Sequence, residues 1–341
     1  MFRIRQIFPA LFFLLMLASC SDDDPTRVVH HVNPVWTPDG KTVVAGYDEY
    51  HYGGDPPSAL RMPSRLAVMD VATRATRIID LGTVATWHTL YSFDPSGTAL
   101  AFVQDGSILF YDLQGRQLLS FAPTEGGTPS LMTFNNTGNS FVWVGTTADG
   151  YTINNTVYDA NGWRILATAP LATVVADDTV TAITLTSQLT YALRTASGTV
   201  REVGFSGNEL NTFTVERIES DNPWHERLVY YNAFTSRFLY AIDREGMMRM
   251  DLNTGGTTRL VKGRIIDFDV SSARESMFYE TRTGDAWIAT TEGLPLSLRL
   301  GESIKASTLM ARFSPAGNGI AMVARHDVYA DSLHILLYRT N

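Results

Sequence analysis

Three short segments of the chain combine aromatic side chains with groups that can transfer protons. In the first, Trp87 precedes His88, and in the second, Trp224 and His225 are followed by Glu226. The indole rings have flat apolar faces and one polar edge, which suits stacking on a sugar ring or gripping a peptide. The imidazoles and the carboxylate can accept and donate protons. These five residues are therefore candidates for a ligand-binding or catalytic site.

The third segment contains His51, Tyr52 and Asp55, in a stretch with two glycines and two prolines. One imidazole from each segment (His51, His88, His225) makes a metal site conceivable, but no spacing typical of metal ligands supports it. We therefore predict neither a metal nor a cofactor. The alternative for all three segments is structural, with tryptophans packed between elements and histidines in surface hydrogen bonds.

The motifs of common catalytic sites are absent from the chain. There is no Gly-x-Ser-x-Gly elbow, no phosphate-binding glycine loop and no His-Glu-x-x-His, because His225-Glu226 lacks the second histidine. No cysteine is free to act as a nucleophile, and the single one in the chain is Cys20. No catalytic residue is therefore assigned.

A phrase that recurs along the chain predicts the elements that must position these segments. An aromatic residue is followed four positions later by Gly, and apolar residues come seven and nine positions after it. The clear copies begin at Trp36, Phe93, Phe134 and Phe313. Weaker copies begin at Ala182, Tyr231 and Phe268. Successive copies begin 37 to 57 residues apart, and self-similarity at a period of this length indicates a repeated supersecondary unit.

Within each unit the sequence predicts four short strands. Apolar and polar residues alternate, as in Leu100–Val103, and the third strand often ends in Asp, as at Asp112 and Asp159. Four strands per unit, repeated radially, predict an all-β fold, a seven-bladed β-propeller with four-stranded antiparallel blades. The propeller is expected to cover residues 26–341. Only residues 26–29 are available to pair with the last blade and close the ring, and a last blade of three strands is the alternative.

The phrase resembles the repeat of TolB-type and WD-like propellers, and Trp36-Thr-Pro-Asp-Gly-Lys41 is nearly that consensus. The resemblance extends from Trp36 to about Tyr338 and is strongest in blades one, two, three and seven. It implies the fold and not an activity, because such propellers serve as binding platforms, as scaffolds and as domains of peptidases.

The connectivity of such a blade predicts where the candidate residues lie. The loop that enters a blade and the loop between its second and third strands lie at one face of the ring. Trp87-His88 and Trp224-His225-Glu226 enter blades two and five, and His51, Tyr52 and Asp55 lie between the second and third strands of blade one. We therefore expect them to share one rim around the central channel, where Tyr230, Arg264 and Arg312 either line the wall or form salt bridges across it.

The N-terminus predicts export. Residues 1–19 contain two arginines and then an apolar stretch of signal-peptide length, which ends in Leu17-Ala18-Ser19-Cys20. This tetrapeptide resembles the lipobox of bacterial lipoproteins, which implies cleavage before Cys20 and acylation of its thiol. Residues 20–25 then form a lipidated flexible tether, and their acidic residues resemble a signal for display outside the outer membrane. The alternative is an ordinary signal peptide.

Charge narrows the class of partner. Without Arg3 and Arg5 the chain has 25 basic and 35 acidic residues, a formal charge of −10, which disfavours nucleic acid and membrane binding other than through the anchor. Two hypotheses follow. The first is a lipid-anchored propeller of the bacterial outer membrane that binds a protein or glycan partner through the rim. The second is a propeller enzyme of the lyase or lactonase kind, with an acid-base or metal site at the channel mouth.

Overall fold

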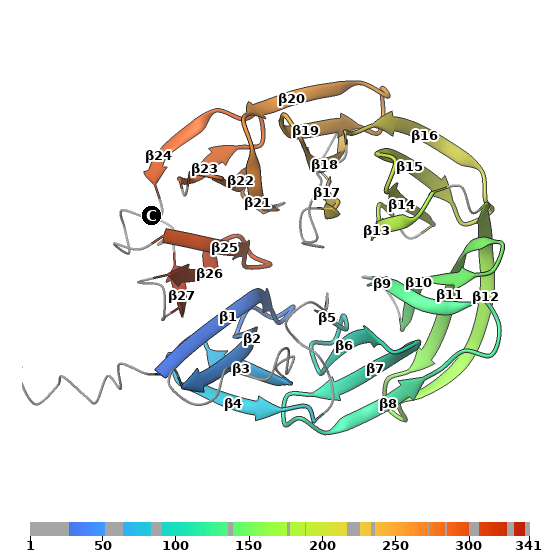
Figure 1. Ribbon diagram of the computed structural model, residues 1–341, viewed down its shortest axis with the longest axis horizontal. Coiled ribbons are helices and arrows are strands. Elements are labelled where there is room, and N and C mark those ends of the chain that lie inside the picture. The colour runs from blue at the N-terminus through green and yellow to red at the C-terminus, as the bar shows by residue number, and fades with distance from the viewer. Residues whose placement is uncertain are drawn as a thin grey trace, which may run out of the picture.

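Seven β-sheets are arranged in a ring (Figure 1). The computed structural model describes residues 27–51, 64–82, 91–135, 139–175, 178–187, 189–216, 226–232, 236–271, 273–283, 285–299, 307–325 and 331–337. In that part of the chain six sheets have four strands and one has three, and every strand pairs with its sequence neighbour in antiparallel fashion. The predicted all-β, seven-bladed propeller is confirmed, whereas the signal peptide and Cys20 lie outside the described residues.

The first three blades contain the two longest stretches of pairing. Blade one is β1 (Arg27–Trp36), β2 (Thr42–His51), β3 (Arg65–Asp70) and β4 (Thr76–Asp80). Blade two is β5 (Tyr91–Phe93), β6 (Ala99–Gln104), β7 (Ser107–Asp112) and β8 (Gln117–Phe121). Blade three is β9 (Thr128–Phe134), β10 (Ser140–Thr147), β11 (Gly150–Asp159) and β12 (Arg164–Val175).

The other four blades follow the same order. Blade four is β13 (Val180–Leu185), β14 (Thr190–Thr195), β15 (Thr199–Gly204) and β16 (Glu209–Thr214). Blade five is β17 (Val229–Asn232), β18 (Arg237–Asp243), β19 (Gly246–Asp251) and β20 (Thr257–Lys262). Blade six is β21 (Ile265–Ser271), β22 (Ser276–Thr281), β23 (Ala286–Thr290) and β24 (Pro295–Arg299), and blade seven is β25 (Ser307–Phe313), β26 (Gly319–Arg325) and β27 (Asp331–Leu337).

The first strand of each blade is innermost and the fourth lies at the outside of the ring (Figure 1). Each first strand ends at the turn that leads into the second strand, and we name that side of the ring the anchor-turn face. The opposite side, where each first strand begins, is the rim face. Because neighbouring strands are antiparallel, the connections into each blade and those between its second and third strands all lie at the rim face.

The hydrophobic core lies between the blades. Strands buried on both faces have continuous apolar runs, and Leu100, Ala101 and Phe102 of β6 are all inaccessible to solvent. Alternate residues of such a strand pack against the blade before it and the blade after it. Among the described residues, a cluster of buried apolar side chains fills each of the seven gaps between neighbouring blades.

The repeated phrase forms a turn that uses each of its residue types. The residue after the aromatic anchor turns its side-chain oxygen onto the first backbone N–H of the next strand, as Asp94 does with Ala99 at 2.8 Å. Gly97 then has φ +73°, which favours glycine. A Cβ atom on Gly97 would also lie 3.0 Å from Cδ of Pro38, in the corresponding turn of blade one. Glycine is thus required both by the backbone and by the neighbouring turn.

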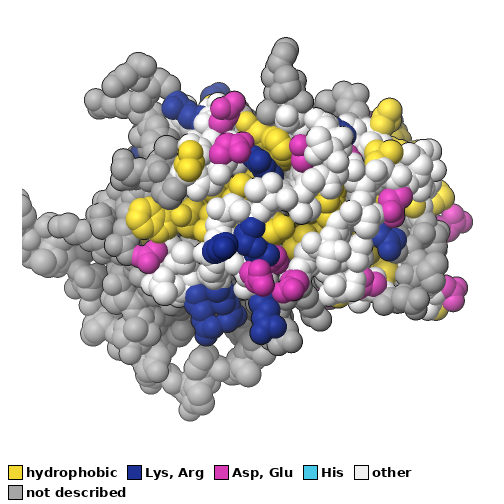
Figure 2. Space-filling model, turned by 90° about the horizontal axis from the view of Figure 1, so that it is seen from above, with side chains coloured by type: hydrophobic (Ala, Val, Ile, Leu, Met, Phe, Trp, Pro, Cys, Tyr) yellow, Lys and Arg dark blue, Asp and Glu magenta, His cyan; other side chains and the backbone are white. Residues whose placement is uncertain are grey.

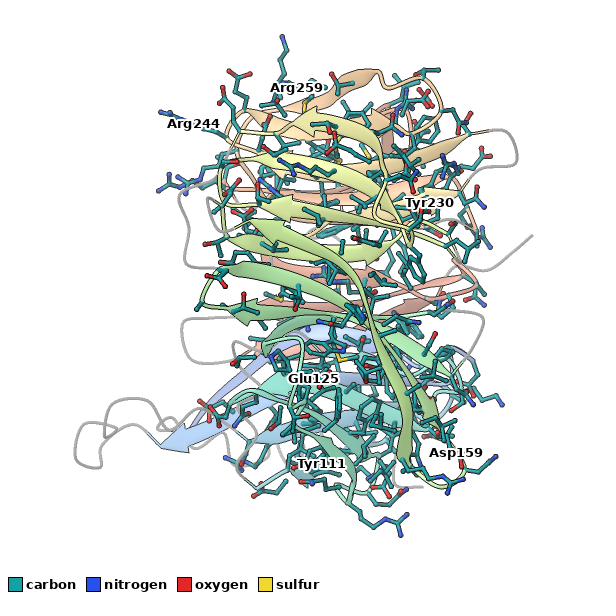
Figure 3. The ribbon with its side chains drawn as sticks, turned by 90° about the vertical axis from the view of Figure 1, so that its right-hand side faces the viewer. Tyr111, Glu125, Asp159, Tyr230, Arg244 and Arg259 are labelled. Carbon is teal, nitrogen blue, oxygen red and sulfur yellow. The ribbon has the colours of Figure 1, made fainter. Side chains whose placement is uncertain are left out.

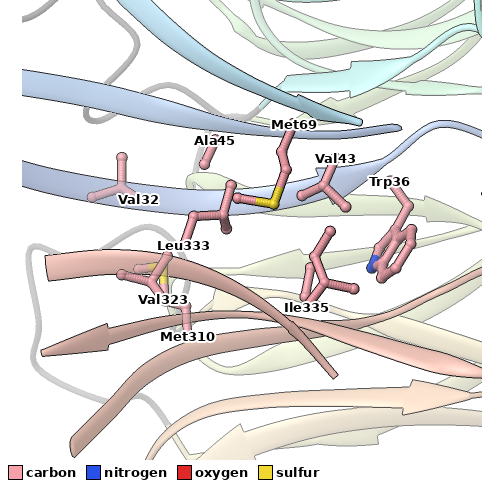
Figure 4. Close-up of a cluster of buried hydrophobic side chains, with 10 residues drawn as sticks. Val32, Trp36, Val43, Ala45, Met69, Met310, Val323, Leu333 and Ile335 are labelled. Atoms are coloured by element: carbon pink, nitrogen blue, oxygen red, sulfur yellow. The ribbon is translucent and has the colours of Figure 1, made fainter. Parts of the chain in front are cut away.

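Of the two expectations for the last blade, closure through residues 26–29 is wrong, and the described residues show the alternative blade of three strands. Residues from Arg27 onward belong to β1, and Arg27 pairs with His51 of β2 inside blade one. In the described residues blade seven has three strands, and side chains join it to blade one (Figure 4). Val32 and Trp36 of β1 pack there with Leu333 and other apolar residues of blade seven. β1 completes blade one because its pairing with β2 continues over nearly its whole length.

Candidate functional site

The strand order places the connections that carry the predicted site on the rim face. The three connections follow β2, β4 and β16 and lead into β3, β5 and β17. Figure 3 shows the two faces from the side: Arg244, between the second and third strands of blade five, lies at the rim face, and Asp159, at the end of β11, lies at the anchor-turn face. Six of the candidate residues lie outside the described residues, so their role stays a prediction: Tyr52, Asp55, Trp87, His88, Trp224 and His225. His51 is the last residue of β2.

Glu226 has a defined environment, and it is buried. Its side chain lies within the ring wall, where its Oε2 is 2.9 Å from Nε of Arg194 in β14, and the Thr181 hydroxyl donates to the same oxygen at 3.3 Å. Arg194 also donates to the carbonyl of Ile242 in blade five at 3.1 Å. Burial lowers the pKa of Arg194, and the Glu226 carboxylate opposes that shift. Glu226 therefore links blades four and five and is held by a buried partner.

A second group of charges lies at the inner edge of blades five to seven, on β21, on β25 and just before β17, and we name it the axial cluster: Arg227, Asp267, Asp269 and Arg312. Asp267, Asp269 and Arg312 are buried, and Arg227 is partly exposed. Nη1 of Arg312 is 2.6 Å from Oδ2 of Asp267, and Nη2 of Arg227 is 3.3 Å from Oδ1 of Asp269. Both carboxylates also accept backbone hydrogen bonds from β25, from Ala311 and Phe313. Each inner strand is thereby joined to the next by charge-assisted hydrogen bonds.

Blades one and two continue this inner set of polar contacts. Trp36 Nε1 donates to the carbonyl of Arg312 at 2.9 Å, which joins blade one to blade seven. The Tyr91 hydroxyl donates to the carbonyl of Asn33 at 2.8 Å, which joins blade two to blade one. Burial raises the pKa of Tyr91, so this hydroxyl stays protonated and remains a donor. Side-chain hydrogen bonds thus connect blade two to blade one, and then continue through blades seven, six and five to blade four.

The axial cluster is electrically balanced. Burial lowers the pKa of Arg312, but the carboxylates of Asp267 and then Asp269 outweigh that effect and raise it above its ordinary value. Burial, followed by repulsion from Arg312, lowers the pKa of Arg227. Within the cluster, two cations face two carboxylates. Of the two alternatives for Arg312, the structure shows a salt bridge, and its partner Asp267 belongs to the neighbouring blade.

Sequence reasoning did not identify Arg194, Arg227, Asp267 or Asp269. For the three that lie within strands, Arg194, Asp267 and Asp269, the available signal was a charge in an otherwise apolar strand, since a buried charge normally requires a partner. The partners could not be identified, because Arg227 and Asp269 are 42 residues apart and Arg312 and Asp267 are 45 apart.

The described residues form no metal-binding cluster and no membrane-spanning helix. Within that part of the chain, no group of three or more His, Cys, Asp or Glu side chains is arranged to hold a metal ion. In the same residues, no helix is long and apolar enough to cross a bilayer.

Solved structures identify the architecture. The β-propeller domain of Cps50 (Swd1) from Myceliophteria thermophila superposes with a TM-score of 0.61 and 14% identity, covering 91% of this chain and 98% of that domain. A chain of the Mitotic Checkpoint Complex matches with a TM-score of 0.58 and 12% identity, covering 90% of this chain and 87% of that one. No protein-family model and no curated protein sequence matches the chain. At these identities the likeness shows the fold alone, a WD40-like seven-bladed propeller.

Proposed function

We propose that this protein is a lipid-anchored binding or scaffold module of the bacterial outer membrane, with repeats of the TolB type. It engages a protein or glycan partner through the rim face, where Trp87 and Trp224 provide the central contacts and His51, Tyr52, Asp55, His88 and His225 surround them. Glu226 supports that face from within, through Arg194.

One observation carries the proposal: the long connections of blades one, two and five all emerge on the same face of a rigid ring. Binding residues are concentrated on loops that a rigid scaffold positions. The buried ionisable groups of the described residues support binding and not turnover, since both Glu226 and the axial cluster are paired within the wall. One of the similar solved structures is itself a chain of a protein complex, which agrees with a scaffold role.

The anchor is tested by changing Cys20. Cys20→Ser removes the thiol to be acylated, and we expect the protein to leave the washed outer-membrane fraction for the soluble fraction. Wild-type protein should incorporate labelled palmitate and the variant should not. Retention of the variant in washed membranes would contradict the anchor, and complete protection of the wild-type protein from added proteinase on intact cells would contradict outward display.

The binding face is tested by cross-linking in intact cells. Trp87→Ala and Trp224→Ala should each weaken binding by about 1–3 kcal/mol, and the double variant should lose the cross-linked species of the wild-type protein. The matched control is Leu189→Ala, which removes an apolar side chain that is 68% exposed at the anchor-turn face. All variants should unfold at the wild-type temperature. Loss of the adduct with Leu189→Ala alone would move the site to the anchor-turn face, and unfolding of the tryptophan variants would show that they pack between blades.

A further inference from the structure

Blade seven has an outer edge that differs from those of the other blades. In the described residues its outermost strand is β27, the third of the blade, which pairs with β26 without irregularity from Asp331 to Leu337. Alternate residues of β27 turn their backbone groups away from β26, and the carbonyl of Ile335 does so, since it accepts from Arg74 of blade one at 2.7 Å. β27 contains neither lysine nor proline, which commonly protect an exposed edge. An edge this regular is a template for a further strand.

Fourth strands complete the other blades on the outer side of the ring. Figure 2 shows this side at β20, which lies at the top of Figure 1, and acidic and basic side chains lie there among apolar ones. In five gaps between blades, the fourth strand of the preceding blade adds an apolar side chain to the cluster that fills the gap: Ile79, Leu119, Leu171, Phe213 and Leu260. Among the described residues, the cluster between blades seven and one has no such member.

Arg74 occupies the place where a fourth strand of blade seven would pass. In other blades the turn between the third and fourth strands packs against the fourth strand of the preceding blade. A Cβ atom on Gly115 of blade two would lie 2.9 Å from the carbonyl oxygen of Asp80 in β4, and Gly293 of blade six lies equally close to β20. Arg74 is the corresponding residue of blade one, with φ +61°, in the region that favours glycine. Its guanidinium extends to Ile335 instead, and this long, exposed side chain covers the edge without closing it.

Ile78 provides an apolar contact beside the same place. It pairs with Ala67 of β3, which pairs with Ala45 of β2, a member of the cluster between blades seven and one. Side chains paired in this way lie on one face of a sheet, so Ile78 is on the face of blade one that is directed toward blade seven. Its side chain is 42% exposed. A strand added to β27 would cover Ile78 and continue the interface between the two blades.

We propose that this open edge, formed by β27, Arg74 and Ile78, binds an extended segment of a partner protein, which pairs with β27 as an antiparallel fourth strand. The segment has apolar side chains at alternate positions, as fourth strands of other blades have, and its backbone N–H replaces Arg74 at the carbonyl of Ile335. A single strand fits, because the edge lies one strand spacing, about 4.8 Å, inside the outer strands of the other blades, and a second folded copy would meet those strands first. The site depends neither on the rim face nor on Cys20.

Backbone-methylated peptides test whether a strand is added. The probe is a fluorescent synthetic peptide of residues 115–122, which contains the fourth strand β8. In β8 the backbone N–H of Phe121 faces β7, and that of Ser120 faces away from it. The unmodified peptide and the control methylated at the Ser120 nitrogen should bind the purified full-length protein saturably, whereas the peptide methylated at the Phe121 nitrogen should bind about tenfold more weakly. Equal affinities for the two methylated peptides, or no binding of any peptide, would overturn the proposal.

Hydrogen exchange locates the bound peptide. Binding should slow exchange of the backbone amides of residues 331–337 and leave that of residues 164–170 unchanged, because the latter belong to β12, the outer strand of a complete blade. Slower exchange at residues 164–170 alone would show that the peptide adds to a complete blade, and would overturn the assignment of the open edge.

Two substitutions change the groups that border the open edge. Arg74→Ala removes the guanidinium that competes for the carbonyl of Ile335, and it should tighten peptide binding several-fold. Ile78→Ser should weaken binding several-fold. The matched control is Leu166→Ser, which also changes an exposed apolar residue of a fourth strand and should leave the affinity unchanged. An unchanged affinity for both Arg74→Ala and Ile78→Ser, or equal losses for Ile78→Ser and Leu166→Ser, would contradict the site.

Photo-cross-linking identifies what occupies the open edge in cells. A photoreactive amino acid at position 78, or at position 166 as the control, is activated in intact cells, and the cross-linked peptide is sequenced by mass spectrometry. We expect an adduct from position 78 alone, with a segment of another protein. In a lysate the unmodified peptide of residues 115–122 should suppress this adduct, and the peptide methylated at Phe121 should not. An adduct within this chain, an adduct with a second copy, or no adduct at all would overturn the assignment of a partner protein.

Discussion

The gap between blades two and three and the inner edge of blades five to seven are both buried, but they are held together differently. Between blades two and three, Phe110 lies within 6 Å of four aromatic ring centres, those of Phe134, Phe141, Tyr158 and Trp163. At the inner edge, the axial cluster joins three blades through paired charges. One region uses contacts that any apolar surface can make, whereas the other uses bonds that require particular atoms.

The two regions contribute differently to the stability of the fold and to the alignment of its blades. Aromatic packing contributes through area removed from water and tolerates small shifts between blades. A buried ion pair contributes less net stability, because desolvation offsets much of the attraction. It does constrain orientation, since Asp269 accepts both from Arg227 of one blade and from the backbone N–H of Phe313 of another. The aromatic gap should therefore dominate stability, and the axial cluster should set how inner strands align.

The largest effect is expected in the aromatic gap. Phe110→Ala removes a side chain with no exposed surface and leaves a cavity among aromatic rings, so it should lower the free energy of unfolding by about 3–5 kcal/mol. Urea unfolding measures the change. The control is Leu166→Ala on the outer strand β12, where the side chain is 55% exposed and the cost should be below about 0.5 kcal/mol. Equal costs would show that this gap is not the stabilising core.

The axial cluster should respond differently to single and paired changes. Asp267→Ala leaves Arg312 buried without its nearest carboxylate and should cost about 3 kcal/mol. The double variant Asp267→Leu, Arg312→Met removes both charges and should recover most of that loss. A double-mutant cycle by urea unfolding measures the coupling, and additive costs would mean that the two side chains do not act as a pair.

Two tyrosines test the same comparison through the removal of one hydroxyl group each. The Tyr91 hydroxyl donates to Asn33 in the inner region, so Tyr91→Phe should cost about 1 kcal/mol. In the aromatic gap the Tyr158 hydroxyl is buried with no hydrogen-bond partner among the described residues. Tyr158→Phe should therefore be neutral or slightly stabilising. Thermal unfolding of both variants checks the prediction, and the reverse order would mean that the polar contact at Asn33 adds nothing.

The smallest effect at neutral pH is expected at Tyr191, in the apolar gap between blades three and four. Burial raises the pKa of Tyr191 to about 12, so the unfolded chain loses this proton first, near pH 10. The tyrosine's contribution is therefore complete below pH 10 and declines as the pH rises from 10 to 12. Tyr191→Phe should leave stability unchanged at pH 7 and should reduce the loss above pH 10. A variant that follows the wild-type curve would show that other tyrosines cause the alkaline loss.

The sequence alone predicted the seven units, their strand order and the face on which the long connections emerge. Each unit signals itself locally: the turn residues from Phe93 to Gly97 satisfy a backbone conformation within one hairpin, and strand periodicity follows from burial on the strand's own faces. The four clear anchors were correctly placed at the ends of the inner strands, as with Trp36 and Phe93, whereas Ala182 and Phe268 lie three residues before the ends of β13 and β21. For the candidate site, sequence reasoning reached the connections but not the pairing that buries Glu226.

Only the tertiary structure decided how the ring closes and where the buried charges meet. Residues 27–29 could pair with either blade one or blade seven on propensity, and the pairing of β1 with β2, which resumes after an irregularity between Val32 and Val35, selected blade one. Likewise, the sequence around Arg194 or Asp267 does not indicate which residue it pairs with, because the atoms that satisfy it belong to other blades. Local signals fix turns and strands, whereas contacts between blades depend on how seven separately specified sheets pack around one axis.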